Sequence, residues 1–188
     1  MILDRLLENP SKKALMIITI LSFVSFSILT ILFQVFGTDA TATGYGILDF
    51  EFGFTSQQIG IIFNAWNDNI FQQQTLGVYL DFIYIPSYVL LLGGLTLLLA
   101  RNLEGKIQKM GLFFTITAGI AGMFDITENI GLLLMLNDAN SYINGTATDI
   151  IPMITSICAT IKFGLLIIGI AFFILSLAYW VLTQRSEK

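Results

Sequence analysis

One lysine and three acidic residues interrupt the long apolar stretches of this chain. Lys162 lies in the run ICATIKFGLLIIGIAFF, and two further runs contain Asp81, Asp125 and Glu128. An ionisable side chain in the hydrocarbon region of a bilayer costs about 2.5 to 3.5 kcal/mol even on the more lenient insertion scales. We therefore expect these four side chains to face protein partners or water, and their presence in one small chain indicates a functional site.

The spacing of the polar residues around Asp125 places them on one side of a helix. At about 100° per residue, Asp125, Glu128 and Asn129 share one face. Small residues continue that face toward the N-terminal end of the same run: Ala118, Ala121 and Gly122. Because small residues let a neighbouring helix approach closely, this face is predicted to point into a helix bundle rather than toward lipid.

Two other apolar runs carry stripes that can face this one. Tyr84 and Tyr88 follow Asp81 at helical spacing, and Pro86 is expected to kink that helix. The stripe around the lysine consists of Thr155, Cys158, Ala159, Lys162 and Gly169. The three stripes together predict a polar pocket inside the bundle.

The charges of this pocket do not balance. Three carboxyls facing one ammonium leave two negative charges in excess if all of them are ionised, and a site of low dielectric does not tolerate that excess. Either a carboxyl keeps its proton, or a cation or cationic ligand binds. Oxygen ligands from Asp81, Asp125 and Glu128 would suit a hard cation such as Mg²⁺ or Ca²⁺. The alternatives are a purely structural ion pair of Lys162 with Asp125, or a pathway for protons or ions.

A catalytic role and a binding role would use largely the same residues. In a catalytic site, Asp125 or Glu128 would act as the general base, and Lys162 would stabilise a developing anion or form a Schiff base. Either Tyr84 or Tyr88 would donate a proton. A ligand-binding site would be formed by Asp81, Tyr84, Tyr88, Asn129 and Trp66.

The chain has no histidine and a single cysteine, Cys158. An intramolecular disulfide is therefore impossible. Without histidine, a Ser-His-Asp triad, a di-iron site, a histidine-ligated haem and the usual zinc sites are excluded. Among cofactors, Mg²⁺ or Ca²⁺ remains compatible with the available oxygen ligands.

The composition is that of a membrane protein. Apolar residues make up 55% of the chain, charged residues 12%, and the mean hydropathy is +0.81, well above that of a soluble domain. Four windows are long enough to cross about 30 Å of hydrocarbon, at residues 15–36, 78–100, 110–136 and 151–182. The sequence predicts an all-α polytopic membrane protein, a four-helix transmembrane bundle that forms one domain over residues 1–188.

Basic residues mark one side of the predicted bundle. Apart from Lys162, they precede the first window, separate the second from the third, or follow the fourth: Arg5, Lys12, Lys13, Arg101, Lys106, Lys109, Arg185 and Lys188. By the positive-inside rule, both termini are predicted to be cytoplasmic, and residues 37–77 and 137–150 to lie outside the cell membrane. The pocket would then open outward. The net charge of −4 disfavours a nucleic-acid partner.

The segments outside the windows have patterns of their own. Residues 1–9 place apolar and charged side chains at helical spacing, which predicts a short interfacial helix. In the outer loop, Thr55 and Gln58 form a capping box ahead of an apolar stripe that ends at Trp66. This pattern predicts an amphipathic helix that lies flat on the outer membrane surface or folds as a lid over the bundle. Residues 48–54 alternate apolar and acidic side chains and predict a short strand or an extended segment.

Three hypotheses about function follow from these features. In the first, the outward-facing pocket binds an amphipathic or lipid-like ligand, with or without a cation. In the second, the chain is a membrane-embedded acid-base or metal-dependent enzyme that acts on a lipid. In the third, it is an accessory subunit of a membrane complex whose buried charges pair with a partner protein. A homo-oligomer is a further possible assembly.

Overall fold

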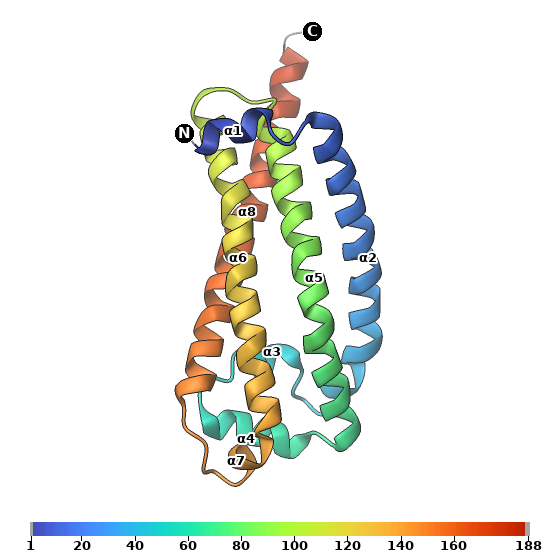
Figure 1. Ribbon diagram of the computed structural model, residues 1–188, viewed down its shortest axis with the longest axis vertical. Helices are drawn as coiled ribbons and strands as arrows, with labels where there is room; N and C mark the ends of the chain where they lie inside the picture. The colour runs from blue at the N-terminus through green and yellow to red at the C-terminus, as the bar shows by residue number, and fades with distance from the viewer. Residues whose placement is uncertain (1, 187–188) are drawn as a thin grey trace. The chain divides into compact units, whose positions relative to one another are not determined.

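The computed structural model describes residues 2–186, and within them the chain consists of helices and the turns that join them (Figure 1). In chain order the helices are α1 (Ile2–Glu8), α2 (Lys12–Ala42), α3 (Ile47–Glu51), α4 (Ser56–Ala65), α5 (Asp68–Ala100), α6 (Gly105–Asn137), α7 (Ala139–Ile143) and α8 (Ile150–Ser186). The predicted all-α class is confirmed.

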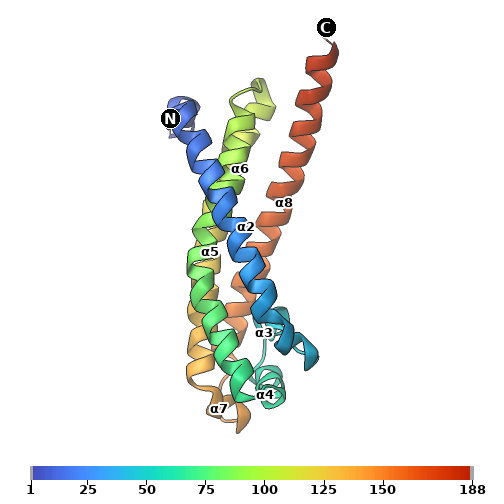
Figure 2. The same ribbon diagram turned by 90° about the vertical axis from the view of Figure 1, so that its right-hand side faces the viewer.

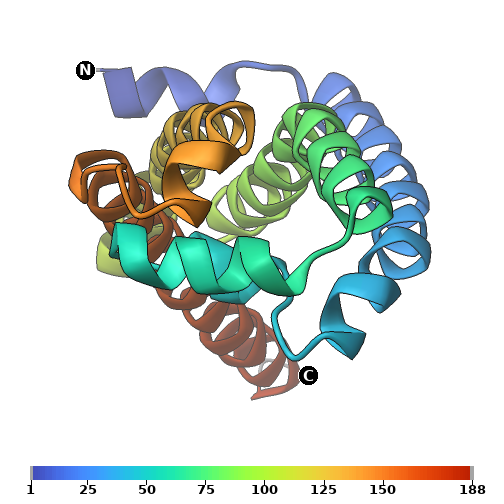
Figure 3. The same cartoon turned by 90° about the horizontal axis from the view of Figure 1, so that it is seen from below.

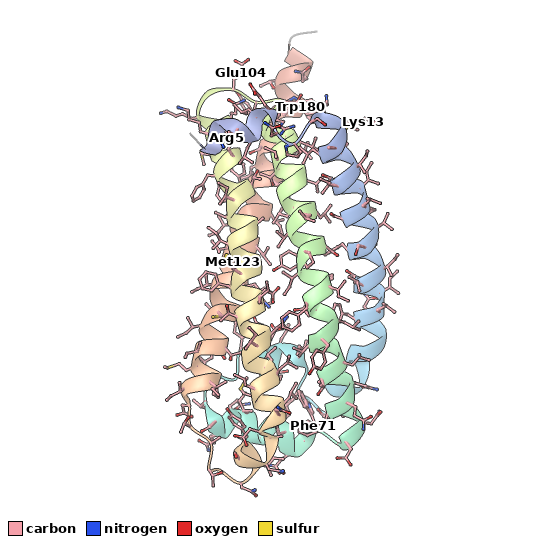
Figure 4. The ribbon with its side chains drawn as sticks, viewed as in Figure 1. Arg5, Lys13, Phe71, Glu104, Met123 and Trp180 are labelled. Atoms are coloured by element: carbon pink, nitrogen blue, oxygen red, sulfur yellow. The ribbon has the colours of Figure 1, made fainter. Side chains whose placement is uncertain are left out.

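Helices α2, α5, α6 and α8 contain the four predicted windows and are long and apolar enough to cross a membrane. Large apolar side chains are exposed along them. Met123 on α6 is 69% exposed and lies on the outward side of its helix (Figure 4). Such side chains would be unfavourable in water, whereas in a bilayer they contact lipid. The four-helix transmembrane bundle is therefore confirmed as the fold.

Contacts within the chain divide it into two compact units, and each of the four long helices contributes a segment to both. Unit 1 comprises Met1–Phe26, Pro86–Gly122 and Phe163–Lys188. Unit 2 comprises Ser27–Ile85 and Met123–Lys162. Lys162 and the three acidic residues predicted to face it all belong to unit 2.

In unit 1, α1 is tied to the end of α5. The guanidinium of Arg101 donates two hydrogen bonds to the carbonyl oxygen of Leu6, with donor–acceptor distances of 2.9 and 2.7 Å. Beyond α1, the hydroxyl of Ser11 accepts a hydrogen bond from the backbone N–H of Ala14 and so caps α2. The small apolar core beneath α1 consists of Leu15, Leu97, Ala100 and Leu112. The predicted N-terminal helix is thus confirmed.

In unit 2, three short helices gather where α5 begins and α6 ends. Helices α3, α4 and α7 lie at this end of the long helices (Figure 2), and α4 and α7 run side by side in the view along the helices (Figure 3). Their contact is close, because a Cβ atom added to Gly60 of α4 would lie 2.6 Å from the carbonyl oxygen of Tyr142 in α7. The apolar core of this end consists of Phe50, Ile59, Ile62, Phe63, Trp66, Ile70, Val78, Leu132, Met135 and Tyr142.

Helix α4 is the predicted amphipathic helix. The Thr55 hydroxyl caps it by accepting a hydrogen bond from the backbone N–H of Gln58, at 3.2 Å. Its apolar stripe enters the core of unit 2, and Ile59 and Ile62 are fully buried. The helix therefore covers this end of the unit with one face and leaves the side chain of Gln57 exposed on the other.

The predicted strand or extended segment over residues 48–54 is wrong, because α3 occupies its first half. The carboxylate of Asp49 accepts a hydrogen bond from the backbone N–H of Gly46, at 2.7 Å, which caps the helix start. In an extended segment, Phe50 and Glu51 would point to opposite faces. In the helix both of them are buried.

Candidate functional site

The acidic face of α6 is buried in unit 2 as the spacing predicts. Asp125 is 3% exposed, Glu128 is fully buried and Asn129 is 2% exposed. Gly131, one turn further along, lets α8 approach, because a Cβ atom at that position would collide with the side chain of Thr155. The close contact of the two helices places Lys162 of α8 against the acidic face of α6.

Lys162 is surrounded by carboxylate oxygens. Its ammonium Nζ lies 3.1 Å from Oδ1 of Asp125. The same nitrogen lies 2.9 Å from Oε1 and 2.8 Å from Oε2 of Glu128. The ammonium donates charge-assisted hydrogen bonds to Oδ1 of Asp125 and Oε1 of Glu128, and these bonds bring together three of the residues for which the sequence predicted a role.

A fourth carboxyl group, that of Glu51 in α3, completes the surroundings of Lys162. Its Oε2 lies 3.7 Å from Nζ, and the residue is 9% exposed. Burial raises the pKa of Glu51 to about 7, against the opposing effect of the Lys162 charge. Sequence reasoning missed this residue because Glu51 lies outside the apolar windows. The one available signal was its position in ILDFEFGF, an apolar stretch of the outer loop.

Asp81 joins the site through Asn129. The side-chain amide of Asn129 donates a hydrogen bond to Oδ2 of Asp81, at 2.7 Å. Asp81 is partly exposed, whereas Glu51, Asp125 and Glu128 are buried. We call the six residues that meet here the Lys162 cluster: Glu51, Asp81, Asp125, Glu128, Asn129 and Lys162.

The other predicted binding residues lie apart from these contacts. The Tyr84 hydroxyl lies 3.4 Å from the Thr30 hydroxyl, and the Tyr84 ring packs edge-on against Phe33. Tyr88 is buried and belongs to unit 1. Trp66 belongs to the aromatic core of unit 2, where its indole N–H donates to the carbonyl oxygen of Tyr45, at 2.9 Å.

The Lys162 cluster contains four carboxyl groups and one ammonium group. Lys162 is the single basic residue in the sequence of unit 2, whereas the cluster contains four carboxyl groups, three of which lie within 3.7 Å of its ammonium. If all five groups are ionised, the sum of one positive and four negative charges is −3. Buried charge of this size is very costly, so the site has to hold protons or bind positive charge.

Helix α3 is held against the cluster by contacts on its C-terminal side. The backbone N–H of Phe54 donates to the hydroxyl of the buried Ser156 on α8, at 3.0 Å. The backbone N–H and the hydroxyl of Ser56 both donate to Oδ1 of Asp149, at 2.6 Å each, and these bonds lower the pKa of Asp149. Phe54 itself has a φ of 51°, in the left-handed region that non-glycine residues rarely adopt.

The metal-binding role predicted for Asp81, Asp125 and Glu128 stays a prediction. Two of these carboxyls contact the Lys162 ammonium. Among the residues that the structure describes, no group of three or more Asp, Glu, Cys or His side chains has an arrangement that could hold a metal ion. The catalytic roles predicted for Asp125, Glu128 and Lys162 also stay predictions.

A hollow of about 370 Å³ opens elsewhere in unit 2, between α4 and α7. Its lining includes Ser56, Gly60, Asn64, Tyr142 and Gly145, and no residue of the Lys162 cluster. This hollow is therefore distinct from the polar pocket that the sequence predicts.

Comparisons with known proteins add no relative. The chain matches no protein-family model, no curated protein and no solved structure. Any function must therefore be inferred from the Lys162 cluster itself.

Proposed function

We propose that this membrane protein binds an amphipathic, lipid-like molecule whose polar head group is held by the Lys162 cluster. The observation that carries the proposal is the surplus of acid around Lys162, whose Nζ lies within 3.7 Å of carboxyl oxygens from three residues. A purely structural ion pair needs one acid. Each further ionisable group in a membrane-spanning helix adds a cost of a few kcal/mol, which a binding function would explain.

The pairing of Lys162 within its own chain disfavours the role of an accessory subunit. A buried lysine whose counter-charge comes from a partner protein would have no acidic partner in the isolated chain. Lys162 instead contacts Asp125 and Glu128 directly. Lys162 is therefore paired without a second protein, and the charge that remains to be compensated is the acidic excess.

The surroundings of the cluster suit an amphipathic ligand. Asp81 is partly exposed and offers a polar contact at the margin of the cluster. On α5, Tyr79 and Ile83 are exposed, but they lie two residues before and after Asp81 and so on the opposite side of the helix from it. In a bilayer these side chains face hydrocarbon, so α5 borders the polar cluster on one side and the acyl chains of lipid on the other.

Native mass spectrometry of the protein extracted in a mild neutral detergent tests the proposal. We expect a lipid-sized molecule to co-purify with the wild type and to be lost from Lys162→Met and from Asn129→Leu. The control is Lys109→Met, which removes an exposed lysine near the start of α6. Asn129→Leu removes no charge, so it tests the cluster even if Lys162→Met fails to fold.

Two results would overturn the proposal. One is a wild-type protein that carries no lipid after gentle extraction and takes none up from mixed lipid micelles. The other is a bound lipid whose occupancy is the same in the wild type, in Asn129→Leu and in Lys109→Met.

A further inference from the structure

The charge of the Lys162 cluster restricts the kind of head group that it can bind, and this restriction rests on the proposed function. Three carboxyl groups lie within 3.7 Å of the one ammonium, and a fourth, that of Asp81, is hydrogen-bonded to Asn129. An anionic head group would add negative charge to a buried site that already has an excess of it, and a neutral head group would leave the excess unchanged. A cationic head group would reduce it.

Glu51 supplies a second, independent indication. Its Oε2 is buried and accepts no hydrogen bond from the described residues, although it points toward Lys162 from 3.7 Å. Buried oxygens of this kind are normally paired with a donor. A primary ammonium provides three N–H donors, whereas a fully ionised phosphate or carboxylate head group provides only oxygen acceptors, which cannot satisfy Glu51.

Asp81 offers a carboxylate that a cationic head group can contact. It is the partly exposed carboxyl of the cluster, and its charge acts on Glu51, where it contributes to the raised pKa. The two carboxyls lie on opposite sides of the α6 acidic face, because Asp81 accepts a hydrogen bond from Asn129, whereas Glu51 shares the Lys162 ammonium with the neighbouring Glu128. They belong to different elements, α5 and α3, and α3 lies outside the membrane-spanning helices.

We infer that the Lys162 cluster takes the ammonium head group of an amphipathic amine, held between the carboxylates of Asp81 and Glu51. The positive head group neutralises part of the acidic excess and donates to the buried oxygen of Glu51. Its alkyl chain lies in the hydrocarbon beside α5. An amine with one long chain is the simplest molecule of this class.

Three additives with the same alkyl chain test the head group: dodecylamine, dodecanol and dodecyl phosphate. Each is added, below its micelle concentration, to the purified full-length protein in a neutral maltoside detergent at pH 7, where the amine is protonated. We expect dodecylamine to raise the midpoint of thermal unfolding by about 5 to 10 °C at a concentration about a hundredfold above its dissociation constant. The alcohol and the phosphate should produce no comparable rise.

Variants locate the amine. Asp81→Asn and Glu51→Gln should each weaken dodecylamine binding by about tenfold or more, because each removes a charged acceptor. The matched control is Asp68→Asn, the same change at an exposed position in the first turn of α5. Glu51→Gln lies outside the membrane-spanning helices, so it remains informative if Asp81→Asn is too unstable to purify.

The outcomes separate this inference from the function on which it rests. Equal amine binding by the wild type, Asp81→Asn and Glu51→Gln would place the amine elsewhere and overturn the inference. A rise with dodecanol or dodecyl phosphate but not with dodecylamine would overturn the ammonium head group and leave the proposed lipid site standing. No rise with any of the three overturns the inference, and if the purified protein also carries no lipid, the proposed function falls with it.

Discussion

The Lys162 ammonium contacts both carboxylate oxygens of Glu128, at 2.9 and 2.8 Å, and Glu128 is fully buried. The two residues come from α8 and α6, which pack closely because Gly131 leaves room for Thr155. This pair is therefore both the centre of the proposed binding site and a link between two helices. Removal of the pair should therefore reduce both stability and binding.

Loss of the lysine should destabilise the protein strongly. Lys162→Met leaves several buried carboxyls without their counter-charge, which costs about 3 to 5 kcal/mol when one partner of a buried ion pair is removed. The free energy of unfolding in detergent measures the effect. In the double variant Lys162→Met/Glu128→Gln, the cost should be smaller than the sum of the two single costs by about 1 to 3 kcal/mol.

Lys109→Met is the control for this prediction, because Lys109 is exposed on α6. It should change the free energy of unfolding by less than about 0.5 kcal/mol. Strict additivity of Lys162→Met and Glu128→Gln would show that the two side chains do not interact.

The apolar windows are sufficient to predict that Lys162, Asp125 and Glu128 lie inside the bundle. A charged residue within such a window must face inward, and helical periodicity then assigns its neighbours on the same face. That reasoning does not apply to Glu51, which lies outside the apolar windows. Its burial depends on the short helix α3 and on the distant contact between Phe54 and Ser156, which local patterns do not encode.

The start of α5 shows a related limit of hydropathy. The helix begins at Asp68, although the predicted window begins at residue 78. The intervening FQQQT is too polar for a membrane window, yet glutamine is a good helix former. The side chain of Asn67 accepts a hydrogen bond from the backbone N–H of Ile70 and so caps the helix before this polar turn.

Stability should depend on pH through Glu51. The pKa of the Glu51 carboxyl is about 7 in the folded protein and 4.5 in the unfolded chain, so the folded protein binds this proton more tightly. Stability should therefore fall as the pH rises from about 4.5 to about 7 and then level off, by up to about 3 kcal/mol. Lys162 from α8, Asp81 from α5, and Asp125 and Glu128 from α6 act on the same carboxyl or lie beside it.

The comparison of the wild type with Glu51→Gln isolates this contribution. Both proteins contain the other titrating groups, so the difference between their unfolding free energies should grow in favour of the glutamine variant over this pH range. Parallel curves across pH 4.5 to 7 would contradict the assignment.

The contact of α4 with α7 predicts opposite effects for the same substitution at two glycines. In Gly60→Ala, the new methyl group meets the carbonyl oxygen of Tyr142 at 2.6 Å, and a backbone atom cannot move aside without moving α7. We expect a loss of about 1 to 3 kcal/mol in the free energy of unfolding. In Gly77→Ala on α5, nothing lies within 4 Å of the new methyl group, and helix propensity should give a gain of about 0.5 to 1 kcal/mol. Equal effects would refute the close contact.

Phe54 should tolerate a substitution that is normally harmful. Its φ of 51° costs about 1 to 2 kcal/mol for a residue with a Cβ atom, and the residue is 43% exposed. Phe54→Gly should therefore leave the free energy of unfolding unchanged or raise it by up to about 1 kcal/mol. The matched change Phe52→Gly, at a φ of −102°, relieves no strain and should be destabilising. A larger loss in Phe54→Gly than in Phe52→Gly would contradict the argument.

The orientation predicted from the basic residues gives the last test. Single cysteines are introduced in a Cys158→Ala background at Asn140 in α7 and at Glu104 between α5 and α6, which are both exposed. The positive-inside rule predicts that a membrane-impermeant maleimide added to intact cells labels Asn140→Cys. Glu104→Cys should react only after the membrane is permeabilised. The reverse pattern would place α3 and the Lys162 cluster on the cytoplasmic side, so that a ligand approaching beside Asp81 would come from the inner leaflet.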